Sequence, residues 1–230
     1  MEIAAKNIYD VLQSKGINKL YHANSVITAC QFLRYKALLS RGAVEKLQCY
    51  QTPQKTDSLD KRYGIWHDIF LDTADYHNKI SRRNLYGPVL FKINIESITV
   101  NYTGPLWMTK LNPTKWSGKK LSERWFNSKE DLETNFVSGE FDHMLVIRHT
   151  GGEFPLGNSL NEIIIDDPNL ESESKVKLYD MAYGAIQYAI SESGSKVPIK
   201  KRECKNSCEC LEQYRSDRNK TEQLYWPGKI

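Results

Sequence analysis

Apolar residues recur along the chain with two kinds of spacing, which predict helices in some segments and strands in others. Spacings of three and four predict a helix over 3–15, a helix that Ser25 could cap and that ends near Leu39, and a helix over 175–191. The last of these would bury Val176, Tyr179, Tyr183, Ile186 and Ile190. Alternation and short apolar runs predict strands at 20–22, 65–71, 89–96, 143–148 and 162–165.

Two long segments lack either spacing. Residues 48–62 are polar and are expected to form a loop, and residues 101–136 mix Gly, Pro and Trp in a way typical of a long loop with short helices. Many short strands with a few helices predict an α+β fold.

Length and composition fit one domain, or two small ones. The chain has 230 residues, of which 40% are apolar and 26% charged, as in ordinary globular proteins. No stretch approaches the roughly 18 apolar residues of a membrane span, and no basic stretch followed by an apolar run marks a secretory signal. The five cysteines are an odd number, which favours a reducing compartment over a disulfide framework. We therefore expect a cytoplasmic protein without membrane partners.

The net charge of +4 is unevenly distributed. Residues 195–230 carry nine Lys or Arg and five Asp or Glu, so the rest of the chain is neutral by count. A second basic excess lies between Leu106 and Glu130, where three tryptophans are spaced nine residues apart. Exposed Trp faces among cations could stack bases and follow phosphates of single-stranded nucleic acid, and the equally weighted alternative is that the tryptophans are buried. The candidate interface comprises Trp107, Trp116, Lys119, Lys120, Arg124 and Trp125.

Three short motifs could carry chemistry. The first, Leu20-Tyr21-His22, ends a predicted strand that runs into a helix. The second, Asp60-Lys61-Arg62, precedes a strand that opens with His67-Asp68. In the third, Asn161-Glu162 begins an apolar strand after a Gly-rich loop. Taken singly, each is more often structural, and their order along the chain is what makes them informative.

In that order, over roughly residues 17–200, the motifs resemble the DarT family of ADP-ribosyltransferases, which modify nucleic acid with NAD. The resemblance rests on 20–25 through 38–40, on 59–62 followed by 67–71, and on 160–167 with the helix after it. The chain departs from the family pattern at Ser25, where a second His is usual, and over 81–88. The resemblance implies an ADP-ribosyltransferase-like fold, in which a split mixed β-sheet is flanked by helices. It implies a domain over 1–200, with 101–136 as an insertion facing the substrate, followed by a basic, Cys-containing segment over 201–230.

The resemblance also implies roles for individual residues. Glu162 would stabilise the oxocarbenium-like transition state and accept the proton of the attacking group, with Glu153 as the rival acid. His22 would hold a ribose hydroxyl or the nicotinamide end of NAD. Arg62 would bind the pyrophosphate, with Arg41 or Arg83 as rivals. Tyr86 could stack on nicotinamide, although a core tyrosine in a turn is the favoured interpretation.

The expected function is therefore transfer of ADP-ribose from NAD to a base of single-stranded DNA or RNA. The family context implies a toxin or anti-phage effector with an antitoxin protein as partner. Two alternatives remain: an ADP-ribosyltransferase that acts on a protein side chain, and a nucleic-acid-binding module without catalysis.

Three of the five cysteines lie close together near the C-terminus, at Cys204, Cys208 and Cys210. Zinc normally takes four ligands, so Cys49 or a histidine would have to complete a site. We favour reduced thiols without a metal, and zinc is the alternative.

Overall fold

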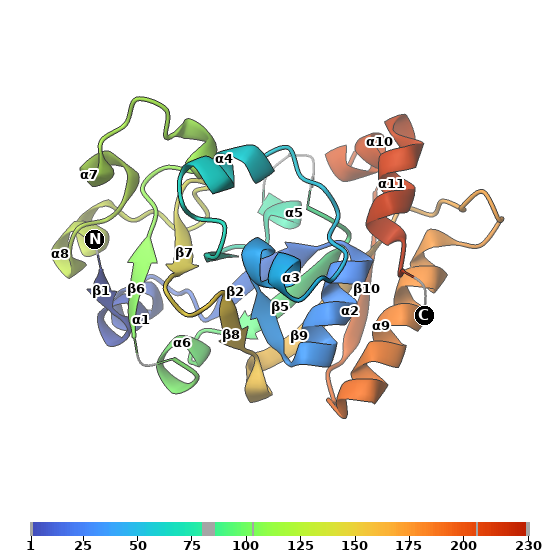
Figure 1. Ribbon diagram of the computed structural model, residues 1–230, viewed down its shortest axis with the longest axis horizontal. Coiled ribbons are helices and arrows are strands. Elements are labelled where there is room, and N and C mark those ends of the chain that lie inside the picture. Colours follow the sequence, from blue (N-terminus) through green and yellow to red (C-terminus); the bar gives the residue numbers. More distant parts are fainter. Residues whose placement is uncertain (1, 80–85, 103, 206, 229–230) are drawn as a thin grey trace.

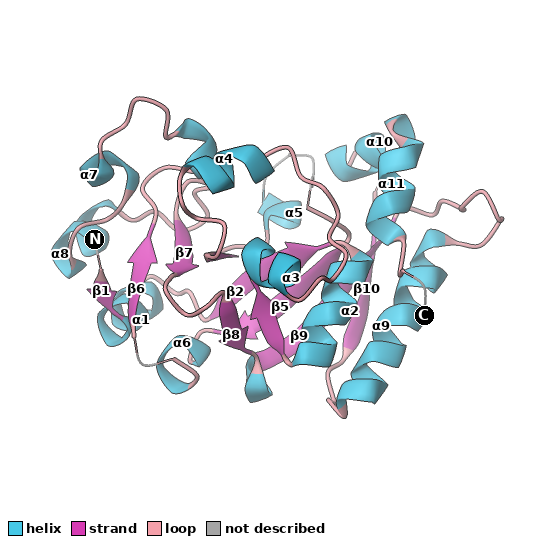
Figure 2. Cartoon of the chain, viewed as in Figure 1, coloured by secondary structure: helices cyan, strands magenta, loops and turns pink. Residues whose placement is uncertain are grey.

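The computed structural model describes residues 2–79, 86–102, 104–205 and 207–228. It is an α+β fold built on a mixed eight-stranded sheet (Figures 1 and 2). Only the β9–β10 pair is parallel among the described strands, and the other neighbours are antiparallel. The strands lie in the order β1 (Ile3–Ala4), β6 (Pro105–Met108), β7 (Met144–Ile147), β4 (Ile69–Asp72), β2 (Lys19–Asn24), β5 (Val89–Asn94), β9 (Leu160–Asp167) and β10 (Ile199–Glu203). A separate two-stranded ribbon pairs β3 (Ala37–Leu39) with β8 (Glu153–Pro155).

Helices flank the sheet. α2 (Val26–Tyr35) packs against α9 (Leu178–Ser193), and α11 (Arg218–Tyr225) contacts both of them. Near the other end of the sheet, α1 (Ala5–Ser14) contacts α6 (Ser97–Val100) and α8 (Lys129–Asn135). The remaining helices are short: α3 (Arg41–Lys46), α4 (Asp57–Arg62), α5 (Tyr76–Lys79), η1 (Pro113–Lys115), α7 (Leu121–Arg124), η2 (Gly157–Ser159) and α10 (Glu209–Ser216). In the described part of the chain, no helix combines the length and the apolar character that crossing a membrane requires.

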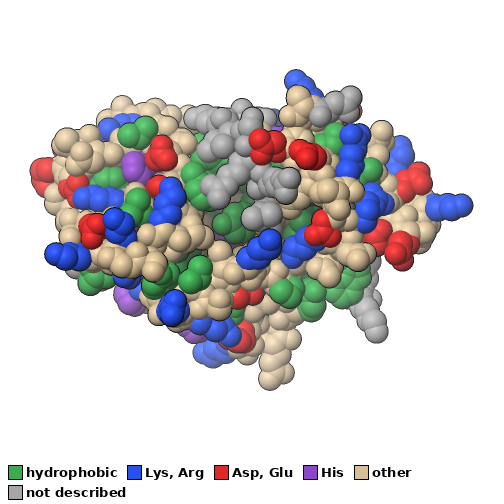
Figure 3. Space-filling model, turned by 90° about the horizontal axis from the view of Figure 1, so that it is seen from above, with side chains coloured by type: hydrophobic (Ala, Val, Ile, Leu, Met, Phe, Trp, Pro, Cys, Tyr) green, Lys and Arg blue, Asp and Glu red, His purple; other side chains and the backbone are tan. Residues whose placement is uncertain are grey.

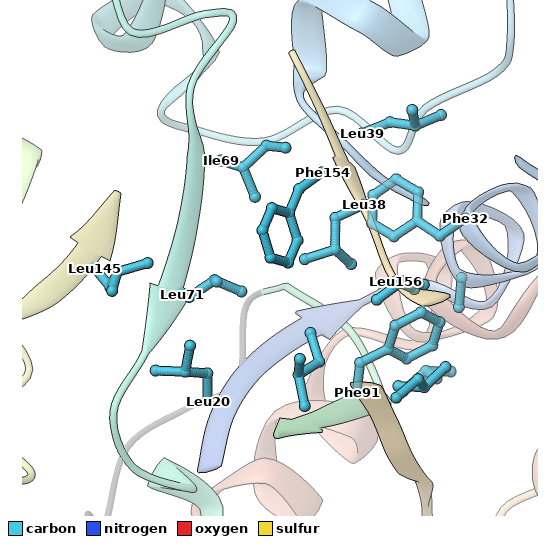
Figure 4. Packing of buried hydrophobic residues seen from close by; sticks show 14 of the residues in the cluster. Leu20, Phe32, Leu38, Leu39, Ile69, Leu71, Phe91, Leu145, Phe154 and Leu156 are labelled. Atoms are coloured by element: carbon cyan, nitrogen blue, oxygen red, sulfur yellow. The ribbon is translucent and has the colours of Figure 1, made fainter. Parts of the chain in front are cut away.

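The main core lies between the sheet, the β3–β8 ribbon and α2 (Figure 4). Leu20, Leu38, Phe91 and Phe154 are completely buried there, and Phe32 of α2 lies edge-on to Phe91 with ring centres 6.3 Å apart. Each such side chain contributes roughly 1.5–3 kcal/mol by burial. This core fixes β2 and the β3–β8 ribbon, which carry the residues of the candidate site.

The structure confirms the α+β class and a strand in each region where one was expected, but it corrects three local predictions. The second helix ends at Tyr35 because Lys36 adopts a left-handed conformation (φ 54°), and the chain then forms β3. Residues 48–62, expected to be a loop, contain α4, which has no buried residue and therefore no apolar pattern.

The third correction concerns the buried face of α9. Val176 precedes the helix, and both Val176 and Tyr183 are exposed. The side chains that pack inward are smaller, which lets α2 approach closely: Leu178, Ala182, Ala185, Ile186 and Ala189.

The two segments that the sequence analysis distinguished from the rest of the chain, 101–136 and 201–230, both contribute residues to the sheet or to the main core. Segment 101–136 contributes β6, which pairs with β1 and β7. Segment 201–230 begins inside β10, and its residues Cys210, Tyr214, Leu224 and Tyr225 belong to the main core. The boundary at residue 200 therefore does not separate two cores.

Candidate functional site

A cleft opens where β2 and β4 diverge. β2 pairs with β5 from Lys19 to Asn24, but the pairing with β4 is limited to Tyr21–Asp72. Beyond that pair, residues 22–25 and 68–70 line the cleft, whose cavity volume is about 160 Å³. Small-molecule sites usually span roughly 300–1,000 Å³, so this cavity is smaller than most of them. The case for a ligand therefore depends on the groups that line the cleft and not on its size.

His22 lies on the β2 side of this cleft in a defined protonation state. Its Nδ1 is 2.8 Å from the carbonyl oxygen of Phe70, and its ring packs against Phe32 at 5.8 Å between centres. Because a carbonyl oxygen can only accept, Nδ1 carries the proton. Burial lowers the pKa of His22, so the ring is neutral at neutral pH and Nε2 keeps its lone pair. Nε2 can therefore accept a hydrogen bond from a ligand hydroxyl.

Arg41 is the cleft-lining arginine. It is the first residue of α3, directly after Ser40, whose side chain accepts a hydrogen bond from the Ala43 amide and caps the helix. One terminal nitrogen donates to Asp57 at 2.7 Å and the other to the Thr52 carbonyl at 3.0 Å. Its Nε is buried and, among the described residues, has no hydrogen-bond partner. The guanidinium is thus fixed in place beside the cleft with one donor unsatisfied.

Neutral polar groups line the wall between these two residues. The hydroxyl of Ser25 bonds to the hydroxyls of Thr28 and Thr52, at 3.0 Å and 2.9 Å. Gln51 donates to the Arg41 carbonyl, while its Oε1 is buried with no partner in the described part of the chain. Gln51 Oε1 and Arg41 Nε are thus two polar atoms of this wall that a polar ligand could satisfy.

Three aspartates also line the cleft, and burial raises the pKa of each. The pKa of Asp60 and of Asp68 rises to about 6, and that of Asp72 to about 7. Asp68 lies 2.7 Å from Arg148 Nε, which partly offsets the effect of its burial. For Asp72, burial raises the pKa with no such offset. At neutral pH Asp60 and Asp68 are largely ionised, and Asp72 is partly protonated.

Other segments complete the cleft. Tyr86 lines it and is 38% exposed, so the favoured interpretation of a core tyrosine is wrong. From α11 come Leu224 and Lys220, whose ammonium donates to the Pro53 carbonyl at 2.9 Å. The C-terminal helix is therefore part of the cleft wall.

Glu162 does not lie in this cleft. Residues opposite one another in a sheet point to the same face, and the register aligns Glu162 with Lys92, Tyr21 and Asp72. Of these residues, Asp72 alone also lines the cleft. His22 is aligned with Phe91 and points to the other face. Both carboxylate oxygens of Glu162 are occupied, by Lys92 at 2.8 Å and by Lys200 at 2.7 Å, and these partners lower its pKa against the effect of burial. The structure thus separates the two residues that the sequence-based hypothesis placed together.

The rival acid, Glu153, does not line this cleft either and faces a separate surface pocket, but its strand pairs with a cleft-lining segment. Glu153 begins β8 and is opposite Leu39, so the two side chains share one face of the ribbon, and Leu39 lines the cleft. The Ser40 amide donates to the Gly152 carbonyl at 2.7 Å. Gly152 has φ +86°, and a Cβ there would lie 2.2 Å from the Ser40 hydroxyl, so glycine is required for this close approach. The Glu153 side chain is exposed.

Arg62, the arginine expected to bind pyrophosphate, is the last residue of α4, is exposed and does not line the cleft. Of its two rivals, Arg41 is the one that the structure brings to His22, and Arg83 lies outside the described residues.

The expected tryptophan platform is wrong for two of its three members. Trp116 and Trp125 are each only 1% exposed, and their ring centres are 4.9 Å apart. Trp107 is half-buried beneath the guanidinium of Arg148, which lies 4.8 Å from its ring centre. These rings form a second, smaller core and cannot offer open faces to bases.

The cations of the same segment differ in whether their side chains can contact phosphates of a nucleic acid. Arg124 stacks on Tyr63 and Trp116, at 5.2 Å and 5.4 Å, and so serves the small core. Lys119 and Lys120 are exposed, and Lys119 pairs with Glu123 at 3.2 Å. Seen from above, the surface has cations interspersed with acids (Figure 3). Of the residues in the candidate interface, Lys119 and Lys120 therefore remain as possible phosphate contacts.

Comparison with known proteins adds no assignment: the sequence matches no protein-family model and no curated protein.

Proposed function

We propose that the protein transfers ADP-ribose from NAD to a base of single-stranded nucleic acid. The observation that carries the proposal is the cleft between β2 and β4, which combines an accepting nitrogen on His22 with an unpaired donor on Arg41. NAD offers the complementary groups, namely ribose hydroxyls that donate and a pyrophosphate that accepts. The resemblance of 20–25 and 38–40 to DarT enzymes points to the same ligand.

In this proposal Arg41 binds the pyrophosphate through Nε, and His22 accepts a hydrogen bond from a ribose hydroxyl. Tyr86 stacks on the nicotinamide. The bond between C1′ of the ribose and the nicotinamide nitrogen breaks, and its electron pair leaves with neutral nicotinamide. The resulting oxocarbenium-like carbon is attacked by a ring nitrogen or exocyclic amine of the acceptor base.

The reaction needs an ionised carboxylate that stabilises the positive charge and removes the proton of the attacking nitrogen. We assign this role to Glu153, because it shares a ribbon face with the cleft-lining Leu39 and is exposed to an incoming acceptor. Glu162, with both oxygens bound to lysines on the opposite face, is assigned a structural role.

The acceptor would reach the cleft past α4, which contacts η1 beside the mouth. Arg62 at the end of α4 and the exposed Lys119 and Lys120 supply positive charge for its phosphates. Modification of bases would block copying of the nucleic acid, which fits a toxin or anti-phage effector restrained by an antitoxin protein.

The direct test is incubation with labelled NAD and separate pools of single-stranded DNA, RNA and protein. We expect label on one nucleic-acid pool with wild-type protein and Glu162→Gln, and none with Glu153→Gln. Label on protein alone would show that the acceptor is a protein side chain and not a nucleic-acid base. Absence of both label and NAD loss in every pool would reject the enzyme in favour of a binding module.

A further inference from the structure

A second cluster of reactive side chains lies at the ends of β9 and β10, outside the cleft. Cys204 follows β10, Cys208 precedes α10 and Cys210 lies in its first turn, while His77 comes from α5. The candidate ligand atoms of His77, Cys208 and Cys210 all lie within 4.8 Å of one another, and so do those of His77, Asp166 and Cys204. Cys208 Sγ lies 3.5 Å from His77 Nε2. His77 is therefore common to both groups.

The orientation of His77 is that of a metal ligand. Its Nε2 faces the sulfur of Cys208, and its Nδ1 lies 3.4 Å from Asp166 Oδ2. This Nδ1 is buried and forms no well-aligned hydrogen bond with any described residue. A histidine that binds a metal through one nitrogen usually presents the other N–H to a carboxylate. Asp166, which is completely buried, supplies that carboxylate.

We propose that Cys204, Cys208, Cys210 and Nε2 of His77 bind one Zn²⁺ ion. A tetrahedral ion with Zn–S bonds of about 2.3 Å holds its sulfurs roughly 3.8 Å apart. Cys204, whose sulfur is grouped with His77 and Asp166, therefore has to move toward the other two sulfurs when the ion binds. Three thiolates and one imidazole select zinc over hard cations such as Mg²⁺ and Ca²⁺. The set fills all four positions, which defines a structural rather than a catalytic site.

The surroundings balance the charge of such a site. Three thiolates around Zn²⁺ leave one net negative charge, and Asp166 adds a second. Arg202 lies against Asp166 at 2.6 Å and against Asp75 at 2.8 Å, and supplies positive charge beside the cluster.

The ion would fasten the C-terminal helices to the sheet. α10 carries two of the ligands and packs against α11, and α11 contributes Lys220 and Leu224 to the cleft wall. The hydroxyl of Tyr225 in α11 donates to the Asp166 carbonyl at 2.7 Å, next to the cluster. Zinc would thus stabilise one wall of the cleft from outside it. Because metal content can be measured without NAD, this inference stands or falls independently of the proposed reaction.

The test is the metal content of the full-length protein, purified under reducing conditions without chelator. We expect about one zinc per chain in the wild type and in Cys49→Ser, and a tenfold or greater loss in Cys208→Ser and His77→Ala. Cys49 is the matched control because it is also a half-buried thiol but lies near Tyr35, at 3.9 Å, and not in the cluster. Less than a tenth of an ion per chain, even after reconstitution with zinc, would overturn the proposal, as would equal losses in the Cys49 and Cys208 variants.

Substitution of cobalt for zinc in the wild-type protein tests the proposal even if the ligand variants fold poorly. Wild-type protein loaded with Co²⁺ should show thiolate-to-cobalt charge-transfer absorption and the intense visible bands of tetrahedral cobalt. A chelator should lower the melting temperature of the wild type. Absence of the charge-transfer absorption, or a melting temperature that does not respond to chelator, would contradict a structural thiolate site.

Discussion

The cleft between β2 and β4 and the row of ion pairs on the opposite face of the sheet both hold charged side chains, but they differ in how those charges are compensated. In the row, Glu162 has a lysine on each carboxylate oxygen. In the cleft, Arg41 Nε and Gln51 Oε1 are buried without partners among the described residues, and burial raises the pKa of three aspartates. A folded chain compensates its charges where they are structural, so the incomplete compensation in the cleft indicates a ligand site.

The largest expected effect separates the two glutamates. Glu153→Gln removes the carboxylate next to the cleft and should slow transfer by about 10²–10⁴-fold, the usual contribution of an acid or base in the transition state. Glu162→Gln, the matched change on the opposite face, should keep turnover within a fewfold of the wild type. Single-turnover transfer of labelled ADP-ribose measures both. A reversed order would return the catalytic role to Glu162.

The pH dependence of stability should have opposite signs for Asp72 and Glu162. The pKa of Asp72 rises from 3.8 to about 7 on folding, so its neutral form is favoured at low pH and stability is lost as pH rises through 7. Asp72→Asn should therefore raise the free energy of unfolding at pH 8 by up to about 4 kcal/mol and leave it nearly unchanged at pH 4. The pKa of Glu162 is lowered, so its stabilisation is present above its ordinary pKa and lost as pH falls.

Denaturant titrations of wild type, Asp72→Asn and Glu162→Gln at pH 4 to 8 measure these differences. Identical pH profiles for the wild type and Asp72→Asn would show that Asp72 is ionised without cost, which would contradict the uncompensated character of the cleft.

NAD affinity should depend on Arg41 rather than on Arg62. Arg41→Ala removes a charge-assisted hydrogen bond worth about 1.5–3 kcal/mol, so the dissociation constant should rise roughly 10–100-fold. Arg62→Ala, at an exposed position outside the cleft, should leave it within twofold. Isothermal titration calorimetry on catalytically inactive Glu153→Gln protein avoids turnover during the measurement. A larger loss of NAD affinity in Arg62→Ala than in Arg41→Ala would indicate that the pyrophosphate binds outside the cleft.

The smallest effect concerns the acceptor surface. Replacing Lys119 or Lys120 with Ala should reduce the slope of log affinity against log salt for single-stranded nucleic acid by about one per lysine. The melting temperature should not change, because both side chains are exposed. A double replacement that leaves the slope unchanged would place the acceptor elsewhere.

The sequence predicts the central strands because they combine alternation with β-branched residues, as β5 shows with Phe91, Ile93 and Lys92. It misses β1, β3, β6 and β8, which are two to four residues long, because so few positions define no period. It misses β10 because that strand has no fully buried residue. It misses α4 because that helix buries nothing. The sequence leaves exposed and buried tryptophans equally weighted, because spacing along the chain says nothing about burial.

The site was predicted in part. His22, Arg41 and Tyr86 are all named from the sequence and all line the cleft. The choice between Glu162 and Glu153 depends on strand register, which sets the face and is fixed by pairing with distant strands. Asp72 could have been noticed as an acid that ends an apolar strand. His77 lies more than a hundred residues before the cysteines, so only the fold brings it to them.

The most direct test of the central claim is a crystal structure of the Glu153→Gln protein with NAD. The account predicts electron density for the dinucleotide between β2 and β4, with a pyrophosphate oxygen within hydrogen-bond distance of Arg41 Nε and a ribose hydroxyl on His22 Nε2. Density for NAD on the opposite face beside Glu162, or an empty cleft at saturating NAD, would contradict it.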